Sequence, residues 1–218
     1  IFINIKNEKK IINVKKLLKN QPQTTIIDVG SNVGSVALPL SKFFKKSFNF
    51  AIEPTVYAYK KLKKNINLNL NLKKRIKKLN YFISNKNSKV KYAHSSWNFN
   101  KRNKRHSIHL GSLKKIIQNN TISLDKLIAK EGRKVHFIKI DVDGYELDVL
   151  KSATKSIKKF KPIIHIEFAP YLHSEFGYST NNLISFIENK IKYKFYSEDL
   201  KKIENIKSYV KKIKNRSE

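Results

Sequence analysis

Residues 24–34 have the sequence T-T-I-I-D-V-G-S-N-V-G, and the organisation of the whole chain follows from this stretch. Apolar residues on both sides of Asp28 predict a short buried strand. Gly30 and Gly34 come next, and residues 33–44 carry apolar side chains at helical spacing. A strand, a glycine turn and a helix in this order are typical of the ligand-binding end of a doubly wound α/β fold. Glycine allows tight turns and the close approach of a ligand, and the chain has only 6 glycines, so we expect this turn to contact a cofactor.

A second strand is expected at residues 48–52, and it ends at Glu53. Pro54 then begins a helix that extends to about Leu70. Glu53 follows Gly30 by 23 residues, about where a dinucleotide-binding fold places the acid that accepts the ribose hydroxyls. An acid at this point can also simply stabilise the helix dipole. Its coincidence with the glycine turn favours the ribose role.

Further strands complete the predicted sheet. Residues 79–84 are expected to form the third strand, with Ser84 and Asn85 at its end beside the cofactor. The other strands are expected at residues 135–143 (V-H-F-I-K-I-D-V-D), 163–167 (I-I-H-I-E) and 193–196, with helices from residues 122–128, 147–150 and 181–191. Strands that alternate with helices predict a mostly parallel sheet, which binds ligands at the carboxyl ends of its strands. Asp141 and Glu167 are expected at such ends.

The segment after the third strand, residues 86–124, is predicted to be an irregular insert. Val90 and Tyr92, together with residues 107–108, suggest a hairpin. Residues 95–109 hold the only Trp, Trp97, and the basic run K-R-N-K-R-H. A long loop at a ligand-bearing edge often shapes the substrate site, but a solvated basic loop explains the same residues, and both interpretations stay open.

Three parts are expected along the chain. Residues 1–22 form an N-terminal helical extension that packs on the sheet, with a basic membrane-surface helix as the alternative. Residues 23–200 form the main domain, and residues 201–218 form a Lys-rich tail that is expected to fray. Within the first helix of the domain, Pro39 is expected to cause a bend because it removes a backbone hydrogen bond.

The composition limits the class of protein. The 218 residues are enough for one domain with a sizeable core, and the absence of Cys excludes disulfides, thiolate zinc sites and a cysteine nucleophile. The formal net charge is +31, but 42 of the 47 basic residues are Lys, and they are scattered over nearly every predicted helix. Codon bias in an A/T-rich genome explains such a composition without a polyanion partner. No apolar run is long enough for a membrane span and no signal peptide is visible, so the expected location is cytoplasmic.

Three ordered stretches resemble the FkbM family of S-adenosylmethionine-dependent methyltransferases. They are D-V-G-S-N-V-G at 28–34, A-I-E-P-T-V-Y-A-Y-K-K-L-K-K-N-I-N-L-N at 51–69, and I-K-I-D-V-D-G-Y-E-L-D-V-L at 138–150 followed by K-P-I-I-H-I-E at 161–167. The resemblance covers about residues 20–200 and implies the class I methyltransferase fold. Asp143 replaces the Glu that is more common in the family, residues 55–57 replace a proline-containing turn, and residues 152–153 replace a Gly-Ala pair.

The resemblance implies S-adenosylmethionine as the cofactor and a hydroxyl group of a sugar, glycan or other small molecule as the acceptor. The residues expected to hold the cofactor are Asp28, Gly30, Ser31, Asn32, Gly34, Glu53, Ser84 and Asn85. The methionine portion is assigned to Asp28 and the glycine turn, and the ribose to Glu53. Since the G-x-G-x-x-G pattern is broken at Asn32 and Ser35, a dinucleotide such as NAD is disfavoured.

Asp141 is the carboxylate expected nearest to the transferred methyl group, where it can orient the acceptor or act as a general base. Glu167 and His165 are further catalytic candidates, since residues two apart on a strand share a face. His165 is also explained as a buried core residue, and Asp143 and Glu146 as helix-capping acids. No metal is predicted, although a divalent ion between Asp141 and Glu167 stays open.

The charge leaves a second class of function open, a nucleic-acid methyltransferase or an RNA-binding Rossmann-like protein. The N/D-P-P-Y/F motif of exocyclic-amine methyltransferases is absent, and residues 141–144 occupy its place. An NAD-linked or non-catalytic Rossmann domain ranks third. The sequence predicts neither the acceptor nor the oligomeric state.

Overall fold

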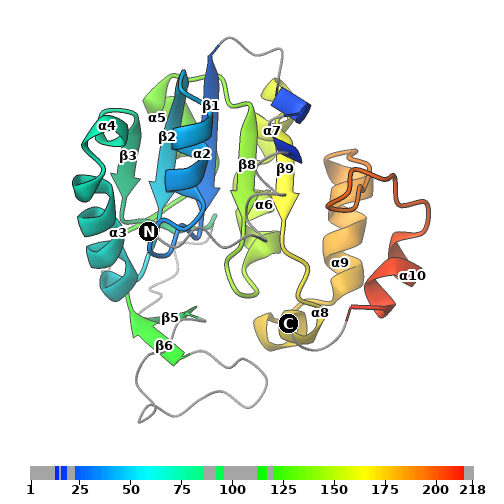
Figure 1. Cartoon of the computed structure of the whole chain (residues 1–218). Coiled ribbons are helices and arrows are strands. Elements are labelled where there is room, and N and C mark those ends of the chain that lie inside the picture. Colours follow the sequence, from blue (N-terminus) through cyan, green and yellow to red (C-terminus); the bar gives the residue numbers. More distant parts are fainter. Residues whose placement is uncertain are drawn as a thin grey trace.

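The computed structural model describes residues 13–14, 16–18, 23–85, 92–95, 112–116 and 120–213. Its centre is a five-stranded sheet of order β3-β2-β1-β8-β9, in which each neighbouring pair is parallel (Figure 1). The strands are β1 (Thr24–Val29), β2 (Ser47–Ile52), β3 (Ile76–Leu79), β8 (Phe137–Ile140) and β9 (Ile163–Ile166). The predicted doubly wound, mostly parallel α/β sheet is confirmed.

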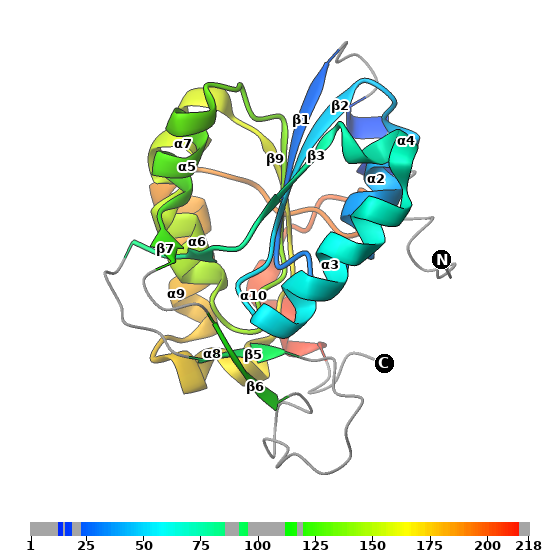
Figure 2. The same ribbon diagram turned by 90° about the vertical axis from the view of Figure 1, so that its left-hand side faces the viewer.

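Helices cover both faces of this sheet (Figure 2). One face carries α2 (Ala37–Phe43), α3 (Val56–Leu68) and α4 (Leu70–Lys73), and the other carries α5 (Leu124–Glu131), α6 (Glu146–Ser152) and α7 (Thr154–Phe160). Side chains of β1 alternate between the two faces, since Ile27 packs with Leu124 and Leu150 while Ile26 packs with Leu40. Because both faces are covered, every residue of β1 is buried.

The third strand differs from the prediction. It is β3, at 76–79, so only Leu79 of the predicted strand 79–84 belongs to it, and the side chain of Asn80 donates to the carbonyls of Glu53 and Pro54. The chain then enters β4 (Phe82–Ile83), which pairs with β7 (Thr121–Ile122) in a separate small sheet. The prediction was wrong because β3 is an edge strand. Lys77 and Lys78 can reach solvent there, so the strand lacks the apolar pattern expected of a buried strand.

The predicted late strand at residues 193–196 is also wrong for the described residues. Tyr193 donates its N–H to the carbonyl of Ile187 and its hydroxyl to the carbonyl of Pro162, 2.9 Å away. These bonds hold it against the end of the preceding helix, and only an isolated bridge joins Tyr196 to Lys202. The alternating aromatic residues at 193–196 therefore pack against neighbouring elements and do not form a β-strand.

The C-terminal part is more ordered than predicted. After β9 come α8 (Pro170–His173), the 3₁₀ turn η1 (Ser174–Phe176), α9 (Thr180–Ser185), the π-helical turn η2 (Phe186–Lys190) and α10 (Ile206–Lys211). Ile206 and Val210 of α10 are buried against Ile184 of α9, so the tail packs through residue 213 instead of fraying from 201.

Two other predictions concern the N-terminal half. Residues 13–14 and 16–18 are helical, and Val14 and Leu18 pack against Phe137 of the sheet, as expected for a packed helix. The first helix of the domain begins at Ala37 rather than at 33, which places Pro39 in its first turn. A missing N–H costs little there, so the reason for expecting a bend disappears.

The insert contains an antiparallel pair, β5 (Tyr92–Ser95) and β6 (Ser112–Lys115), in agreement with the expected hairpin at Tyr92. Val90, Trp97, the basic run at 101–106 and residues 107–108 lie outside the described residues.

Candidate functional site

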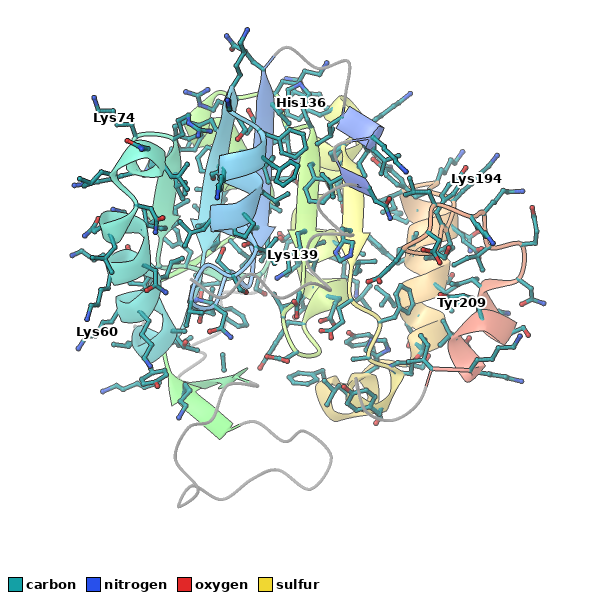
Figure 3. All side chains as sticks on the ribbon, viewed as in Figure 1. Lys60, Lys74, His136, Lys139, Lys194 and Tyr209 are labelled. Atoms are coloured by element: carbon teal, nitrogen blue, oxygen red, sulfur yellow. The ribbon has the colours of Figure 1, made fainter. Side chains whose placement is uncertain are left out.

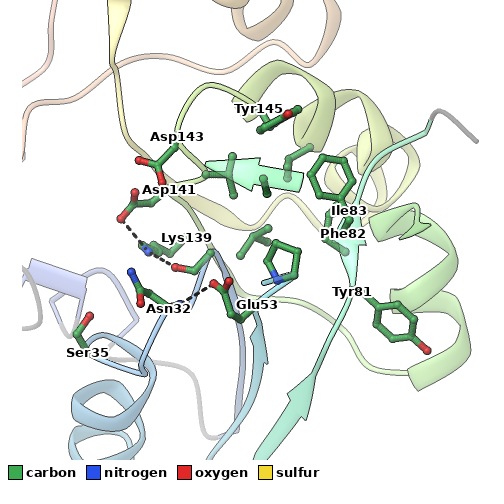
Figure 4. A pocket seen from close by; sticks show the side chains of 16 residues that line it. Asn32, Ser35, Glu53, Tyr81, Phe82, Ile83, Lys139, Asp141, Asp143 and Tyr145 are labelled. Atoms are coloured by element: carbon green, nitrogen blue, oxygen red, sulfur yellow. Dashed lines mark hydrogen bonds and ion pairs between the residues drawn. The ribbon is translucent and has the colours of Figure 1, made fainter. Parts of the chain in front are cut away.

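A pocket opens where the carboxyl ends of β1, β2 and β8 meet, beside the point where the strand order reverses (Figure 4). Open α/β sheets bind ligands at this position. The wall of the pocket has three parts: the polar turn after β1, the acids after β8, and an apolar side formed by residues 81–83 and by α6. The lining residues include Asn32, Glu53, Phe82, Lys139, Asp141 and Asp143.

The turn after β1 is fixed by close packing against β8. Gly30 has φ +81°, and a Cβ atom on it would lie 1.9 Å from the carbonyl oxygen of Asp141. The N–H groups of Gly30 and Ser31 both donate to the carbonyl of Ile52. The close approach of β8 therefore requires glycine at position 30. Gly30 also lines the pocket.

The other residues of this turn divide into those that line the pocket and those that shape the turn. Asn32 lines it, and its side-chain Oδ1 is buried with no hydrogen-bond partner among the described residues. Ser31 donates its hydroxyl to the carbonyl of Asp28 instead, and Gly34 packs against Leu62 of α3. Ser31 and Gly34 thus lie behind the pocket wall rather than in it.

Glu53 lies at the end of β2 with its carboxylate in the pocket wall. Its Oε1 accepts the N–H of Thr55 at 2.9 Å and the hydroxyl of Thr55 at 2.5 Å, and its Oε2 accepts the N–H of Asn32 at 3.0 Å. Burial raises the pKa of Glu53, although these hydrogen bonds oppose the rise. The bonds fix the orientation of the carboxylate and leave one lone pair of Oε2 for a ligand hydroxyl.

A buried lysine connects β1 with β8. The Nζ of Lys139 lies 3.3 Å from Oδ1 of Asp28, 2.9 Å from Oδ2 of Asp141 and 3.2 Å from the carbonyl of Gly30. Burial alone would lower the pKa of Lys139, but the two carboxylates raise it above its ordinary value. Asp28 does not line the pocket; it is 1 % exposed and acts as the buried counter-ion of Lys139.

The sequence analysis assigned no role to Lys139, although a lysine within a strand of apolar residues indicates a buried charge. Lys139 stands in F-I-K-I, a strand whose residues are all buried, and it lies within the third stretch that resembles the FkbM family. A lysine in a buried strand needs counter-charges. The two acids that supply them, Asp28 and Asp141, are both among the predicted site residues.

The predicted catalytic residues Asp141, Glu167 and His165 come together at the ends of β8 and β9. Asp141 and Glu167 are joined by a side-chain hydrogen bond. Burial would raise the pKa of Asp141, but Lys139, that hydrogen bond and the field of His165 lower it. Burial and the charge of Asp141 raise the pKa of Glu167 instead. These opposite shifts favour a proton on Glu167 and an ionised Asp141.

Asp141 lies between two hollows of the molecule. It lines the pocket beside Glu53, and it also lines a larger groove that runs along β9 and includes His165 and Glu167. No other residue of the described ranges lines both. Its side chain is 44 % exposed, so it can be reached by a ligand.

Ser84 and Asn85 do not take the expected place. Neither lines the pocket; Ser84 is buried, and the Asn85 amide donates to the carbonyl of Lys151 at the end of α6. The reason is the early end of β3, after which Tyr81, Phe82 and Ile83 form the pocket wall instead.

Aromatic residues in the pocket wall were missed by the sequence analysis. Phe82 packs edge-on against Tyr145, with ring centroids 5.0 Å apart, and Tyr145 packs in turn against Phe176 at 4.4 Å. Together with Val142 and Val149 they give the pocket an apolar side suited to a flat ring. Only the fold brings these segments together, so spacing in the sequence could not identify them.

In the part of the chain that the structure describes, no group of three or more His, Cys, Asp or Glu residues is arranged to hold a metal ion. None of the described helices has the length and apolar content of a transmembrane span.

The family assignment rests on the sequence as a whole. Residues 28–195 match the model of the methyltransferase FkbM domain, which is most of the chain. The chain belongs to the FkbM methyltransferase family. The predicted resemblance is thereby confirmed, and the cofactor of this FkbM methyltransferase is S-adenosylmethionine.

Three of the solved structures to which this chain is similar are the following. A precorrin-6y C5,15-methyltransferase from Geobacter metallireducens is 9 % identical, with 83 % of this chain and 68 % of that chain covered and a TM-score of 0.47. An S-adenosylmethionine-dependent methyltransferase from Aquifex aeolicus is 15 % identical, with 86 % and 82 % covered and a TM-score of 0.41. P. horikoshii TYW2 in complex with MeSAdo is 25 % identical over 39 % of this chain, which spans only 32 % of that protein, with a TM-score of 0.29. A search of curated proteins finds no significant relative.

The pocket of the FkbM methyltransferase suits its cofactor. Its polar side offers acceptors, namely Glu53, the unsatisfied Asn32 Oδ1 and the acids Asp141 and Asp143, which match ribose hydroxyls, an amino group and a positively charged sulfur. The aromatic side matches an adenine ring. A pyrophosphate would instead face three carboxylates, which disfavours a dinucleotide.

Proposed function

We propose that this FkbM methyltransferase methylates a hydroxyl group of a sugar, a glycan or another small molecule. The observation that carries the proposal is the position of Asp141, which lines both the cofactor pocket and the groove beside β9. Methyl transfer requires the donor and the acceptor to meet at one point, and Asp141 lies at the junction of the two hollows.

When bound, S-adenosylmethionine supplies an electrophilic methyl group. Glu53 would hold the ribose and Asn32 the polar end of the cofactor, while Lys139, backed by Asp28, fixes the orientation of Asp141. Asp141 would orient the acceptor hydroxyl and take its proton as a carbon–oxygen bond replaces the methyl–sulfur bond, which would leave S-adenosylhomocysteine as the second product. His165 and Glu167, which line the groove on the other side of Asp141, would hold the acceptor.

The charge does not favour a nucleic-acid substrate. Lys60 and Lys74 lie on the side of α3 and α4, whereas Lys194 lies at the opposite side of the molecule (Figure 3). A nucleic-acid interface gathers its basic residues on one face. The scattered lysines support a compositional origin of the +31 charge.

Calorimetric titration tests the cofactor part of the proposal. S-adenosylhomocysteine is expected to bind the chain and NAD is not, and Glu53→Ala is expected to weaken S-adenosylhomocysteine binding by at least about tenfold, or 1.4 kcal/mol, because a buried ribose acceptor is lost. Glu188→Ala, on an exposed surface of η2, is the matched control. A folded chain that binds no S-adenosylhomocysteine would overturn the proposal.

Transfer of a labelled methyl group to a panel of sugars, glycans, other hydroxyl compounds and RNA tests the acceptor part. Asp141→Asn is expected to lower kcat by about 10²–10⁴, which is the usual contribution of a positioned general base. Full activity of that variant would remove Asp141 from the mechanism. Transfer to RNA alone would replace the hydroxyl-acceptor proposal by the nucleic-acid alternative.

A further inference from the structure

The loop between β8 and α6, residues 141–145, carries two acids of the pocket in a strained conformation. Asp143 has φ +51° and Gly144 has φ +104°, both in the left-handed region. A Cβ atom on Gly144 would lie 2.2 Å from the ring of Phe176, so the loop is also closely packed from outside. Such a conformation persists only where neighbouring groups hold it.

The group that holds this loop is the side chain of Glu146, which is fully buried. Its Oε1 accepts the N–H of Gly144 at 3.1 Å and that of Val142 at 3.3 Å. Its Oε2 lies 3.2 Å from the hydroxyl oxygen of Tyr178. One carboxyl group thus connects the loop to the segment after η1.

The hydrogen bonds around Tyr178 show which form of Glu146 fits. The hydroxyl oxygen of Tyr178 lies 2.8 Å from the carbonyl oxygen of Gly144, which can only accept, so the single proton of Tyr178 is used there. The second and longer contact, between Tyr178 and Oε2 of Glu146, gains a proton of its own if Glu146 is protonated and donates. With an ionised Glu146, the single phenol proton would have to be shared between the carbonyl oxygen of Gly144 and Oε2.

The remaining surroundings offer little charge compensation. Among the described residues, His173 is the one basic side chain within ion-pair distance, with Nε2 3.9 Å from Oε2 of Glu146, and this Nε2 has no hydrogen-bond partner. Burial lowers the pKa of His173 to about 4, so it is neutral at physiological pH. Asp143 in the loop faces Glu146 with like charge. The charged and titratable neighbours therefore favour the neutral acid, whereas the backbone N–H groups that Glu146 accepts favour the ionised form.

We propose that Glu146 is a positioning residue that works as a neutral carboxylic acid: it holds the loop 141–145, and with it Asp141 and Asp143, by accepting two backbone N–H bonds and donating one to Tyr178. This inference rests on the proposed function for its consequence in catalysis, but the state of Glu146 is independent of it. Burial, with the charge of Asp143, raises the pKa of Glu146 to about 7, against hydrogen bonds that oppose the rise. Ionisation above that pH would loosen the loop.

Carboxyl ¹³C NMR of the chain labelled at glutamate tests the state of Glu146 without any ligand. The resonance that disappears in Glu146→Gln belongs to Glu146, and its titration midpoint is expected at about pH 7. A midpoint at or below the ordinary glutamate value of 4.5 would overturn the proposal.

A variant series tests the positioning role through S-adenosylhomocysteine binding at about pH 6 and about pH 8.5, on either side of the expected titration. The affinity of the wild type is expected to fall by about tenfold from the lower to the higher pH. Glu146→Gln keeps one acceptor and replaces the donating O–H by N–H. Its affinity is expected to stay within about threefold of the wild type at the lower pH and to lose the pH dependence. Glu146→Ala and Tyr178→Phe are expected to bind weakly at both. Glu188→Gln is the matched control and keeps the wild-type pH dependence.

Two outcomes contradict the proposal. If Glu146→Gln binds as weakly as Glu146→Ala while remaining folded, the ionised carboxylate is the working form. If Glu146→Gln keeps the full pH dependence of the wild type, another group titrates. Absence of any binding by the folded wild type would instead contradict the proposed methyltransferase function, and the NMR titration would still decide the state of Glu146.

Discussion

At the scale of single residues, the site depends on Lys139, the buried cation between Asp28 and Asp141. We expect Lys139→Met to lower the free energy of unfolding by about 3–5 kcal/mol, because it leaves the carboxylate of Asp28 buried and unpaired. Denaturant unfolding followed by circular dichroism measures this loss. The double variant Asp28→Asn with Lys139→Met removes both charges and is expected to recover part of it.

An exposed lysine provides the control for this change. Lys194→Met is expected to alter stability by less than about 0.5 kcal/mol, as surface substitutions usually do. If Lys139→Met were as mild as Lys194→Met, the link between Asp28, Lys139 and Asp141 would contribute nothing to the fold.

The site residues that sequence reasoning found and those it missed differ in a physical way. Glu53 and Asp141 stand directly after buried strands, and a polar residue at that point lies at the ligand edge of a parallel sheet. Asp28 was predicted to hold the cofactor, but it does not line the pocket and contacts Lys139 instead, because it lies inside the strand rather than after it. The aromatic wall at Phe82 and Tyr145 depends on packing between distant segments, which no local pattern contains.

At the scale of elements, most of the strands that the sequence predicted correctly lie in the centre of the sheet, and the misplaced third strand lies at its edge. β1, β2 and β8 were predicted because strands in the middle of a covered sheet need continuous apolar sequence. β9 is an edge strand, but it was predicted because it keeps the apolar run I-I-H-I. β3 and residues 193–196 were misplaced because an edge strand tolerates lysines, and because alternating aromatic residues can pack against a helix as well as form a strand.

The junction of β1 with β8 gives a prediction at this scale. We expect Gly30→Ala to destabilise the chain by at least about 3 kcal/mol and to abolish S-adenosylhomocysteine binding, since the added methyl group would overlap the backbone of Asp141 and push the two strand ends apart. Thermal unfolding and calorimetry measure the two effects.

Gly132 offers a matched control for that change, because it too has positive φ, +63°, but a Cβ atom there would meet nothing within 4 Å. Gly132→Ala is expected to cost only the backbone strain of about 1–2 kcal/mol and to leave binding intact. Equal losses in the two variants would mean that strain alone, rather than the contact with β8, explains Gly30.

At the scale of the whole molecule, the dominant feature is the +31 charge, which bears on stability. The ion pairs found among exposed described residues, such as Lys77 with Glu131 and Lys202 with Glu204, offset little of it. Lysines that cover several sides of the molecule repel one another in the folded state more than in an expanded chain.

Screening should therefore stabilise this protein. Raising NaCl from about 0.01 M to about 0.15 M shortens the Debye length from about 30 Å to about 8 Å, which removes most of the repulsion between distant lysines. We expect the free energy of unfolding to rise by about 1 kcal/mol and Tm by about 2–4 °C for a chain of this size. Calorimetric scans across this salt range, with sucrose at equal osmolality as the uncharged control, make the measurement. A Tm that falls with salt would mean that attractive ion pairs outweigh the repulsion, and the lysines would then have a structural role that their scattered placement does not suggest.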